Sequence, residues 1–166
     1  MAESVAFYIF GTLALVGALL IVFVKNPVSS AMSLVLTLFS TSALFLNLHA
    51  PFIAAIQVLV YAGAIMVLFL FVIMLLNLSP DELGKPKYAG WKLIGGLLGA
   101  AFLVSMVFVF LLSEIPGVKP FLDDSFGSVK TVGGLLFTTY VLPFELAGIL
   151  LFVAIIGAVV LAKKDY

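Results

Sequence analysis

A run of about 26 residues without a charged side chain, residues 52–77, limits this chain more than any other feature of its sequence. A helix of that length is roughly 39 Å long, whereas the hydrocarbon core of a bilayer is about 30 Å thick. The run therefore predicts a membrane-spanning helix that tilts, bends or protrudes. In its first half, Gln57 and Tyr61 carry the polar side-chain atoms. They are four residues apart and share one helical face.

The rest of the chain has the composition of an integral membrane protein. Of its 166 residues 64% are hydrophobic and only 10% are charged, against about 25% charged in soluble domains. We therefore expect an all-α membrane protein, with residues 1–166 forming a single polytopic domain. Its five transmembrane helices are predicted at residues 4–24, 29–48, 52–77, 91–112 and 142–162. Ser29 or Ser30 is the expected N-cap of the second helix, and residues 128–140 predict a short interfacial helix.

The lysines predict an orientation for these helices. Five spans place the two termini on opposite sides of the membrane. Alternating connections then put six lysines on one side and two on the other, and lysine-rich connections face the cytoplasm. We expect an external N-terminus and a cytoplasmic C-terminus. The six are Lys25, Lys85, Lys87, Lys92, Lys163 and Lys164; the two are Lys119 and Lys130.

Several functions are excluded or disfavoured by residues that the sequence lacks. It has no cysteine and one histidine, so we expect no metal site and no iron–sulfur ligation. Its eight basic residues form no patch suited to nucleic acid. No phosphate-binding or hydrolase motif occurs. No charged residue lies near the middle of a predicted span, which disfavours an autonomous pump or ion carrier.

Four residues are candidates for a functional role. Gly63 lies where an irregular backbone is tolerated only if neighbouring protein covers it. The side chains of Gln57 and Tyr61 are placed to supply hydrogen bonds that an irregular backbone near Gly63 would lose. Tyr61 could equally be an ordinary aromatic residue packed against a neighbouring helix. Glu145 opens the last span, either as an interfacial carboxylate at the helix N-terminus or as a proton-exchanging or intersubunit contact. These are gating, hinge or supporting candidates, and none is a catalytic residue.

Three stretches of the sequence resemble a known family. Residues 60–77 (VYAGAIMVLFLFVIMLLN) closely resemble the third transmembrane helix of the subunit J family of bacterial NADH:quinone oxidoreductase, respiratory complex I. Residues 25–31 (KNPVSSA) and 136–147 (LFTTYVLPFELA) resemble other signatures of the family, in the same order.

This resemblance implies a non-redox membrane-arm subunit in the bacterial inner membrane, packed against subunits A, H, K and N. The complex uses NADH, FMN, iron–sulfur clusters and a quinone, and none of these is expected to bind this chain. In the family, the third helix can hold a π-bulge near the positions matching Tyr61 and Gly63. Interconversion of bulged and regular helix is thought to gate a water chain toward carboxylates of subunit K.

Three functions are therefore compared. The first is a subunit that helps couple quinone reduction to proton pumping through a switchable third helix. The second is a small subunit of a multisubunit cation/proton antiporter, and the third is a purely structural membrane module. The missing mid-membrane charge disfavours an autonomous transporter, and the resemblance of residues 60–77 favours the first function over the third.

Overall fold

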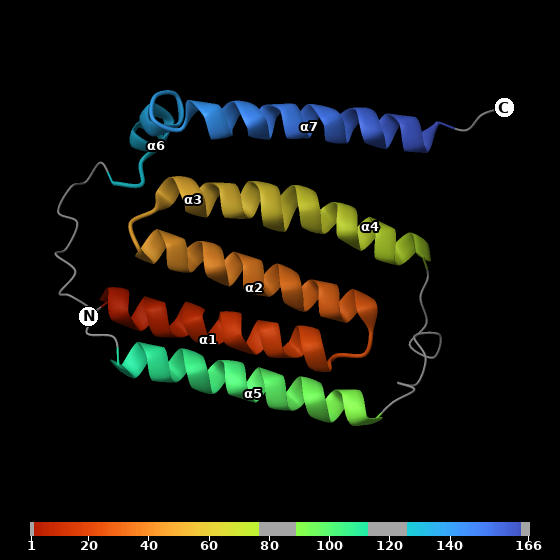
Figure 1. Cartoon of the computed structure of the whole chain (residues 1–166). Helices are drawn as coiled ribbons and strands as arrows, with labels where there is room; N and C mark the ends of the chain where they lie inside the picture. Colours follow the sequence, from red (N-terminus) through yellow and green to blue (C-terminus); the bar gives the residue numbers. More distant parts are fainter. Residues whose placement is uncertain (1, 77–88, 113–125, 164–166) are drawn as a thin grey trace.

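The computed structural model describes residues 2–76, 89–112 and 126–163, and all regular structure within them is helical. Within these described ranges, five helices are long and apolar enough to cross a membrane, as predicted. Figure 1 shows them lying roughly parallel, with the chain reversing direction from one to the next and the two termini at opposite ends. The third span consists of three helical segments in direct succession. In chain order the elements are α1 (Ala2–Phe23), α2 (Pro27–Asn47), α3 (Pro51–Ile56), the π-helix η1 (Gln57–Ile65), α4 (Met66–Leu76), α5 (Ala89–Leu112), α6 (Val129–Leu136) and α7 (Val141–Ala162).

Helix α2 is the centre of the packed part of the chain. It contacts α1 on one side and α3, η1 and α4 on the other (Figure 1). The α1–α2 crossing is tight because Gly17 has no side chain: a Cβ there would overlap the Thr37 hydroxyl and lie 3.3 Å from the Ser33 carbonyl. Ser30 Oγ also donates a 2.8 Å hydrogen bond to the Ile21 carbonyl of α1. Small residues and interhelical hydrogen bonds hold membrane helices together in this way.

The start of α2 differs from the prediction. The N-cap is Asn26, whose Oδ1 accepts from the Val28 and Ser29 amides at 2.9 and 3.2 Å. Pro27 then occupies the first helical turn, where its missing N–H has no cost. The prediction of Ser29 or Ser30 as N-cap was wrong because proline was assigned to the turn instead of to the helix.

Helices α5 and α7 stand apart from the packed part. No close backbone contact joins α5 to another described helix, and α7 has such contacts only with α6. Small residues in a membrane helix let a neighbouring helix approach closely, yet no atom of the described chain lies within 4 Å of a Cβ built at Gly95, Gly96 or Gly99 of α5. The described residues therefore leave most of the surface of these two helices uncovered.

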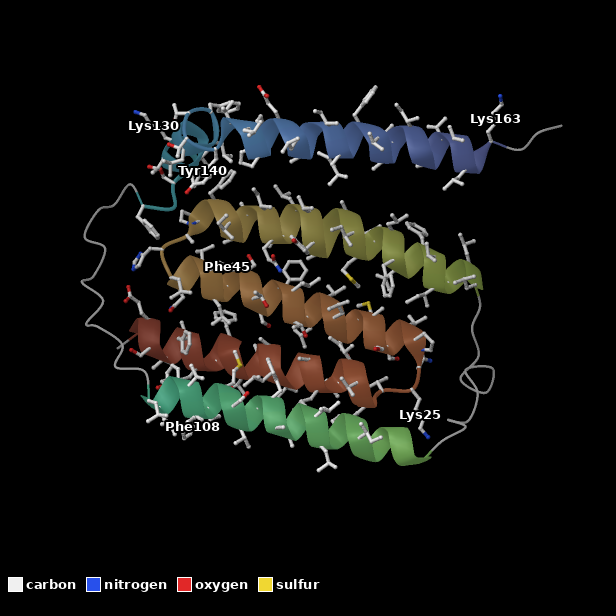
Figure 2. All side chains as sticks on the ribbon, viewed as in Figure 1. Lys25, Phe45, Phe108, Lys130, Tyr140 and Lys163 are labelled. Carbon is white, nitrogen blue, oxygen red and sulfur yellow. The ribbon has the colours of Figure 1, made fainter. Side chains whose placement is uncertain are left out.

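The positions of the described lysines at the helix ends agree with the predicted division of the lysines between the two sides of the membrane. Lys25 and Lys163 lie at one end of the structure and Lys130 at the other (Figure 2). Helix α6, capped by Ser128 through a 3.2 Å bond from the Thr131 amide, belongs to the Lys130 end. The interfacial helix predicted over residues 128–140 is therefore present but shorter. The expected polar loops, with Lys85, Lys87 and Lys119, lie outside the described residues, as does Asn77, the predicted end of the third span.

Candidate functional site

The three hinge candidates of the third span all lie within one irregular segment. Gln57, Tyr61 and Gly63 belong to η1, a π-helix of nine residues. In a π-helix each N–H bonds to the carbonyl five residues earlier, and such segments often mark functional sites. The Met66 N–H, for example, donates to the Tyr61 carbonyl, five residues earlier, and also to the Gly63 carbonyl, three residues earlier. The prediction of a π-bulge is confirmed, although the segment is longer than the one-residue widening that was expected.

The segment has a regular beginning. The Gln57 N–H donates to the Ala54 and Ile53 carbonyls, three and four residues earlier, which is the pattern of an α-helix or a tightened α-helical turn. Helix α3 therefore enters the third span in the ordinary register. The change in register occurs inside η1, about halfway through the predicted membrane span.

Gly63 lies at a close contact of this ladder. A Cβ built on Gly63 would lie 3.2 Å from the Val58 carbonyl oxygen. Val58 is five residues earlier, so its carbonyl is the partner that the π pattern assigns to the Gly63 N–H. A side chain at this position would crowd the hydrogen bond that defines the π-helix.

The five-residue pattern is already mixed at the end of η1. The Met66 N–H faces the Gly63 carbonyl, three residues earlier, as well as the Tyr61 carbonyl, five residues earlier. Helix α4 then continues as a regular α-helix. Within η1, Ala62 is 7% exposed, and the segment contacts α2.

The side chains of Gln57 and Tyr61 do not supply the expected substitute hydrogen bonds. Within residues 2–76, 89–112 and 126–163, no hydrogen bond involves the Gln57 side-chain amide or the Tyr61 hydroxyl. Gln57 is half-buried, and Tyr61 is 48% exposed. Both side chains therefore lie where a neighbouring subunit or water can reach them, and they do not stabilise η1 from within the described chain.

Glu145 is not part of this site. It lies in the second turn of α7, exposed, on a helix that has no close backbone contact with α3, η1 or α4. The structure thus brings together Gln57, Tyr61 and Gly63 through one helical segment and leaves Glu145 separate.

Two residues near the site were not predicted from the sequence. Ser42 of α2 donates a buried 2.8 Å hydrogen bond to the Ala54 carbonyl, three residues before η1. Gly127 has φ +68°, and its carbonyl accepts from the Phe52 N–H at 3.2 Å. The sequence signal for Ser42 was only the serine and threonine content of α2. The signal for Gly127 was only a glycine immediately before Ser128. Neither pattern indicates which distant backbone group is the partner.

The donor set does not suit a metal or a redox centre. The sequence has no cysteine, and the described ranges contain no group of three or more His, Asp or Glu side chains that could hold a metal ion. An iron–sulfur cluster needs thiolate ligands, with histidine as the occasional replacement. What Gln57, Tyr61 and Gly63 share is their place in a segment of irregular helical register.

The sequence matches a family of known proteins over most of its length. The family model for NADH-ubiquinone/plastoquinone oxidoreductase chain 6 matches residues 17–161. The chain is 37% identical to NADH-quinone oxidoreductase subunit J of Escherichia coli K12, covering 96% of this chain and 86% of the relative. It is also 37% identical to NADH-ubiquinone oxidoreductase chain 6 of Cyanidium caldarium, covering 97% and 84%. With the chloroplastic NAD(P)H-quinone oxidoreductase subunit 6 of Physcomitrium patens it shares 35% identity, covering 98% and 85%.

Proposed function

Because this chain belongs to the subunit J/chain 6 family of NADH:quinone oxidoreductase and is a multi-pass membrane subunit of that complex, we propose that its third span is a conformational switch that couples quinone reduction to proton pumping. The observation that carries the proposal is η1, the nine-residue π-helix that contains Gln57, Tyr61 and Gly63. In this proposal the subunit carries no electrons. It changes shape next to a proton path.

The free energy of the irregular segment suits a two-state element. A carbonyl left buried and unpaired costs about 1–3 kcal/mol. Two conformations that differ by a few kcal/mol leave the minor state at roughly 0.1–10% of the population. A π-helical segment leaves a backbone carbonyl without its usual partner where the α-helix resumes, so regular α-helix is an accessible alternative for η1.

Conversion would turn one half of the span against the other. Removing one residue from the ladder rotates the following helix by about 100° and shifts it by about 1.5 Å. Every side chain of helix α4 is apolar. The rotation therefore changes which apolar side chains of α4 face the neighbouring helices, and so changes the size of the gap between them. Such a change opens or closes a water chain by size, without moving a charge of this chain.

The groups that hold the protons come from elsewhere in the complex. No charged residue lies near the middle of any span here, and an ionisable group at that depth is the usual mark of a proton relay. The path therefore runs between this chain and carboxylates of neighbouring subunits, with subunit K beside the third span and subunits A, H and N as further contacts. The exposed helices α5 and α7 supply surface for such contacts.

The assignment to the complex is tested by purification. A tag at the C-terminus of this chain, followed by gentle detergent extraction of the bacterial cell membrane, should recover NADH-oxidising activity with flavin and iron–sulfur absorbance. Recovery of the tagged chain in an antiporter assembly without flavin would overturn the proposal. Recovery of the tagged chain without partner subunits, from membranes that still oxidise NADH, would also overturn it.

The orientation gives a separate prediction. A reporter fused after Tyr166 should act as cytoplasmic, and one inserted between Asp123 and Asp124 as external, because the end with more lysines faces the cytoplasm. Labelling of a cysteine at Lys85 by an impermeant reagent added from outside would show that the arrangement is inverted.

Glu145 is expected to have a supporting role. It lies near the external end of α7, away from η1, so Glu145→Gln should retain most NADH:quinone turnover while lowering the yield of assembled complex. The measurements are turnover per flavin and complex abundance in membranes. If the complex assembles fully but no longer pumps, the carboxylate belongs to the proton path.

A further inference from the structure

One buried hydrogen bond links α2 to the third span just before η1. Ser42 Oγ donates to the Ala54 carbonyl at 2.8 Å. Both partners lie deep inside the packed part of the chain: Ser42 is 5% exposed and Ala54 only 1%. The bond therefore holds the last turn of α3 to α2, three residues before the π-helix begins at Gln57.

The other hydroxyls in the middle of α2 do something different. Each donates to a carbonyl of α2 itself, four residues earlier, at 2.8–3.0 Å. Such bonds satisfy the hydroxyl without tying the helix to a neighbour. Ser40 is the closest comparison, because it is 3% exposed and donates to the Leu36 carbonyl at 2.8 Å. Ser42 differs from Ser40 in its partner and not in its burial.

A second connection holds the beginning of the same segment. The Phe52 N–H donates to the Gly127 carbonyl at 3.2 Å. Gly127 itself is packed against the turn between α2 and α3, so closely that a Cβ there would lie 2.6 Å from the His49 carbonyl oxygen. Helix α3 is therefore held at its first turn by Gly127 and at its last turn by Ser42.

The other half of the third span has no comparable connection. Every side chain of α4 is apolar, and within the described residues no hydrogen bond joins α4 to another packed helix. Met66, 2% exposed, is held by packing alone. Dispersion contacts have no fixed partner, so α4 can turn against α2 without breaking a hydrogen bond, whereas α3 cannot.

We propose that Ser42 is a positioning residue that holds α3 stationary, so that a change of register in η1 turns α4. This inference rests on the proposed function, and it adds the group that decides which half of the span moves. Without the Ser42 hydroxyl, the rotation would be divided between α3 and α4, and the change at the α4 end would be smaller.

Two distances measured in the intact complex test this inference. Spin labels carried on non-canonical amino acids at Leu46 of α2 and Ile53 of α3 report the held half. Labels at Val28 of α2 and Phe71 of α4, which line one apolar hollow, report the moving half. Each pair is measured in membranes at rest and during turnover with NADH and quinone, in the wild type, Ser42→Ala and the matched control Ser40→Ala.

In the wild type and in Ser40→Ala, turnover should change the Val28–Phe71 distance and leave the Leu46–Ile53 distance unchanged. In Ser42→Ala, the resting Leu46–Ile53 distribution should lose its single narrow distance, and turnover should now move it. Ser42→Thr, which keeps a hydroxyl, should restore the wild-type pattern. If Ser42→Ala does not assemble, Ser42→Thr and Ser42→Val are compared, since they differ in the hydroxyl and hardly in volume.

The role of Ser42 would be overturned if Ser42→Ala left the Leu46–Ile53 distance distribution unchanged. If Ser42→Ala does not assemble, the same conclusion would follow from identical distributions in Ser42→Thr and Ser42→Val. Failure of the proposed function gives a different result: the Val28–Phe71 distance of the wild type would not respond to turnover. In that case the resting Leu46–Ile53 distribution still decides whether Ser42 holds α3.

Discussion

Gly63→Val and Gly63→Leu will depress quinone-coupled proton pumping while leaving NADH oxidation with artificial acceptors intact. Gly63 is the one residue of η1 whose missing side chain the π-helix uses. Its Cβ would lie 3.2 Å from the Val58 carbonyl oxygen, which is closer than ordinary van der Waals contact. In the proposed function this chain carries no electrons, so NADH oxidation with artificial acceptors serves as an internal control for assembly.

The expected size of the effect follows from the crowding. Overpacking a well-packed site costs about 1–3 kcal/mol, and each 1.4 kcal/mol changes a population ratio tenfold. Either substitution at Gly63 would therefore reduce the ratio of π-helical to α-helical state by roughly 5- to 100-fold. If the switch must visit both states in each turnover, the pumping rate falls in proportion to the population of the π-helical state.

The matched control for Gly63→Val is Gly148→Val in α7. Gly148 also lies in a membrane span, but no atom of the described chain comes within 4 Å of its Cβ position. We expect Gly148→Val to keep the normal ratio of protons to electrons if it assembles. A Gly63→Val complex that assembles and pumps at the normal rate and ratio would show that η1 is an ordinary packing segment.

Gly127→Ala will strongly reduce the amount of assembled complex. Gly127 has φ +68°, a left-handed conformation that costs about 1–2 kcal/mol for residues with a Cβ. The added methyl group would also lie 2.6 Å from the His49 carbonyl oxygen and 2.8 Å from the Ala50 Cα. Both contacts are with backbone, which cannot move aside as a flexible side chain would.

The control for Gly127→Ala is Gly133→Ala, five residues after Ser128 in α6. No atom of the described residues lies within 4 Å of a Cβ at Gly133, and alanine is a better helix former than glycine by about 1 kcal/mol. Gly133→Ala should therefore assemble at least as well as the wild type. The measurement is the abundance of the complex in membranes by native gel and its thermal stability in detergent. Equal abundance of the two variants would mean that the contact between Gly127 and the α2–α3 turn is not needed.

Much of the fold was predictable because long apolar runs have few alternatives. All five spans were predicted, and the helix limits differ from the prediction by two residues or fewer where the structure describes them. The start of α2 was wrong because Asn26 and Pro27 look like a turn but form the cap and the first turn of the helix. Local sequence patterns fit both arrangements.

The candidate site was predictable in place but not in detail. The polar pair Gln57 and Tyr61 and the nearby Gly63 pointed to η1, and the resemblance of residues 60–77 suggested a π-bulge. The length of η1 was not predictable, because α- and π-helix differ by the pairing of a few backbone groups. The contacts of Ser42 with Ala54 and of Gly127 with His49 depend on chain segments far apart in sequence, which periodicity does not report.

The central claim is that η1 exists in two registers during turnover, and the most direct measurement is a cryo-electron microscopy structure of the intact complex. Samples frozen at rest and during steady turnover with NADH and quinone would be sorted by the backbone of Gln57–Ile65. The account predicts a π-helical class and a regular α-helical class, with α4 rotated between them and α3 in the same place. A single π-helical register in every class under turnover would contradict it.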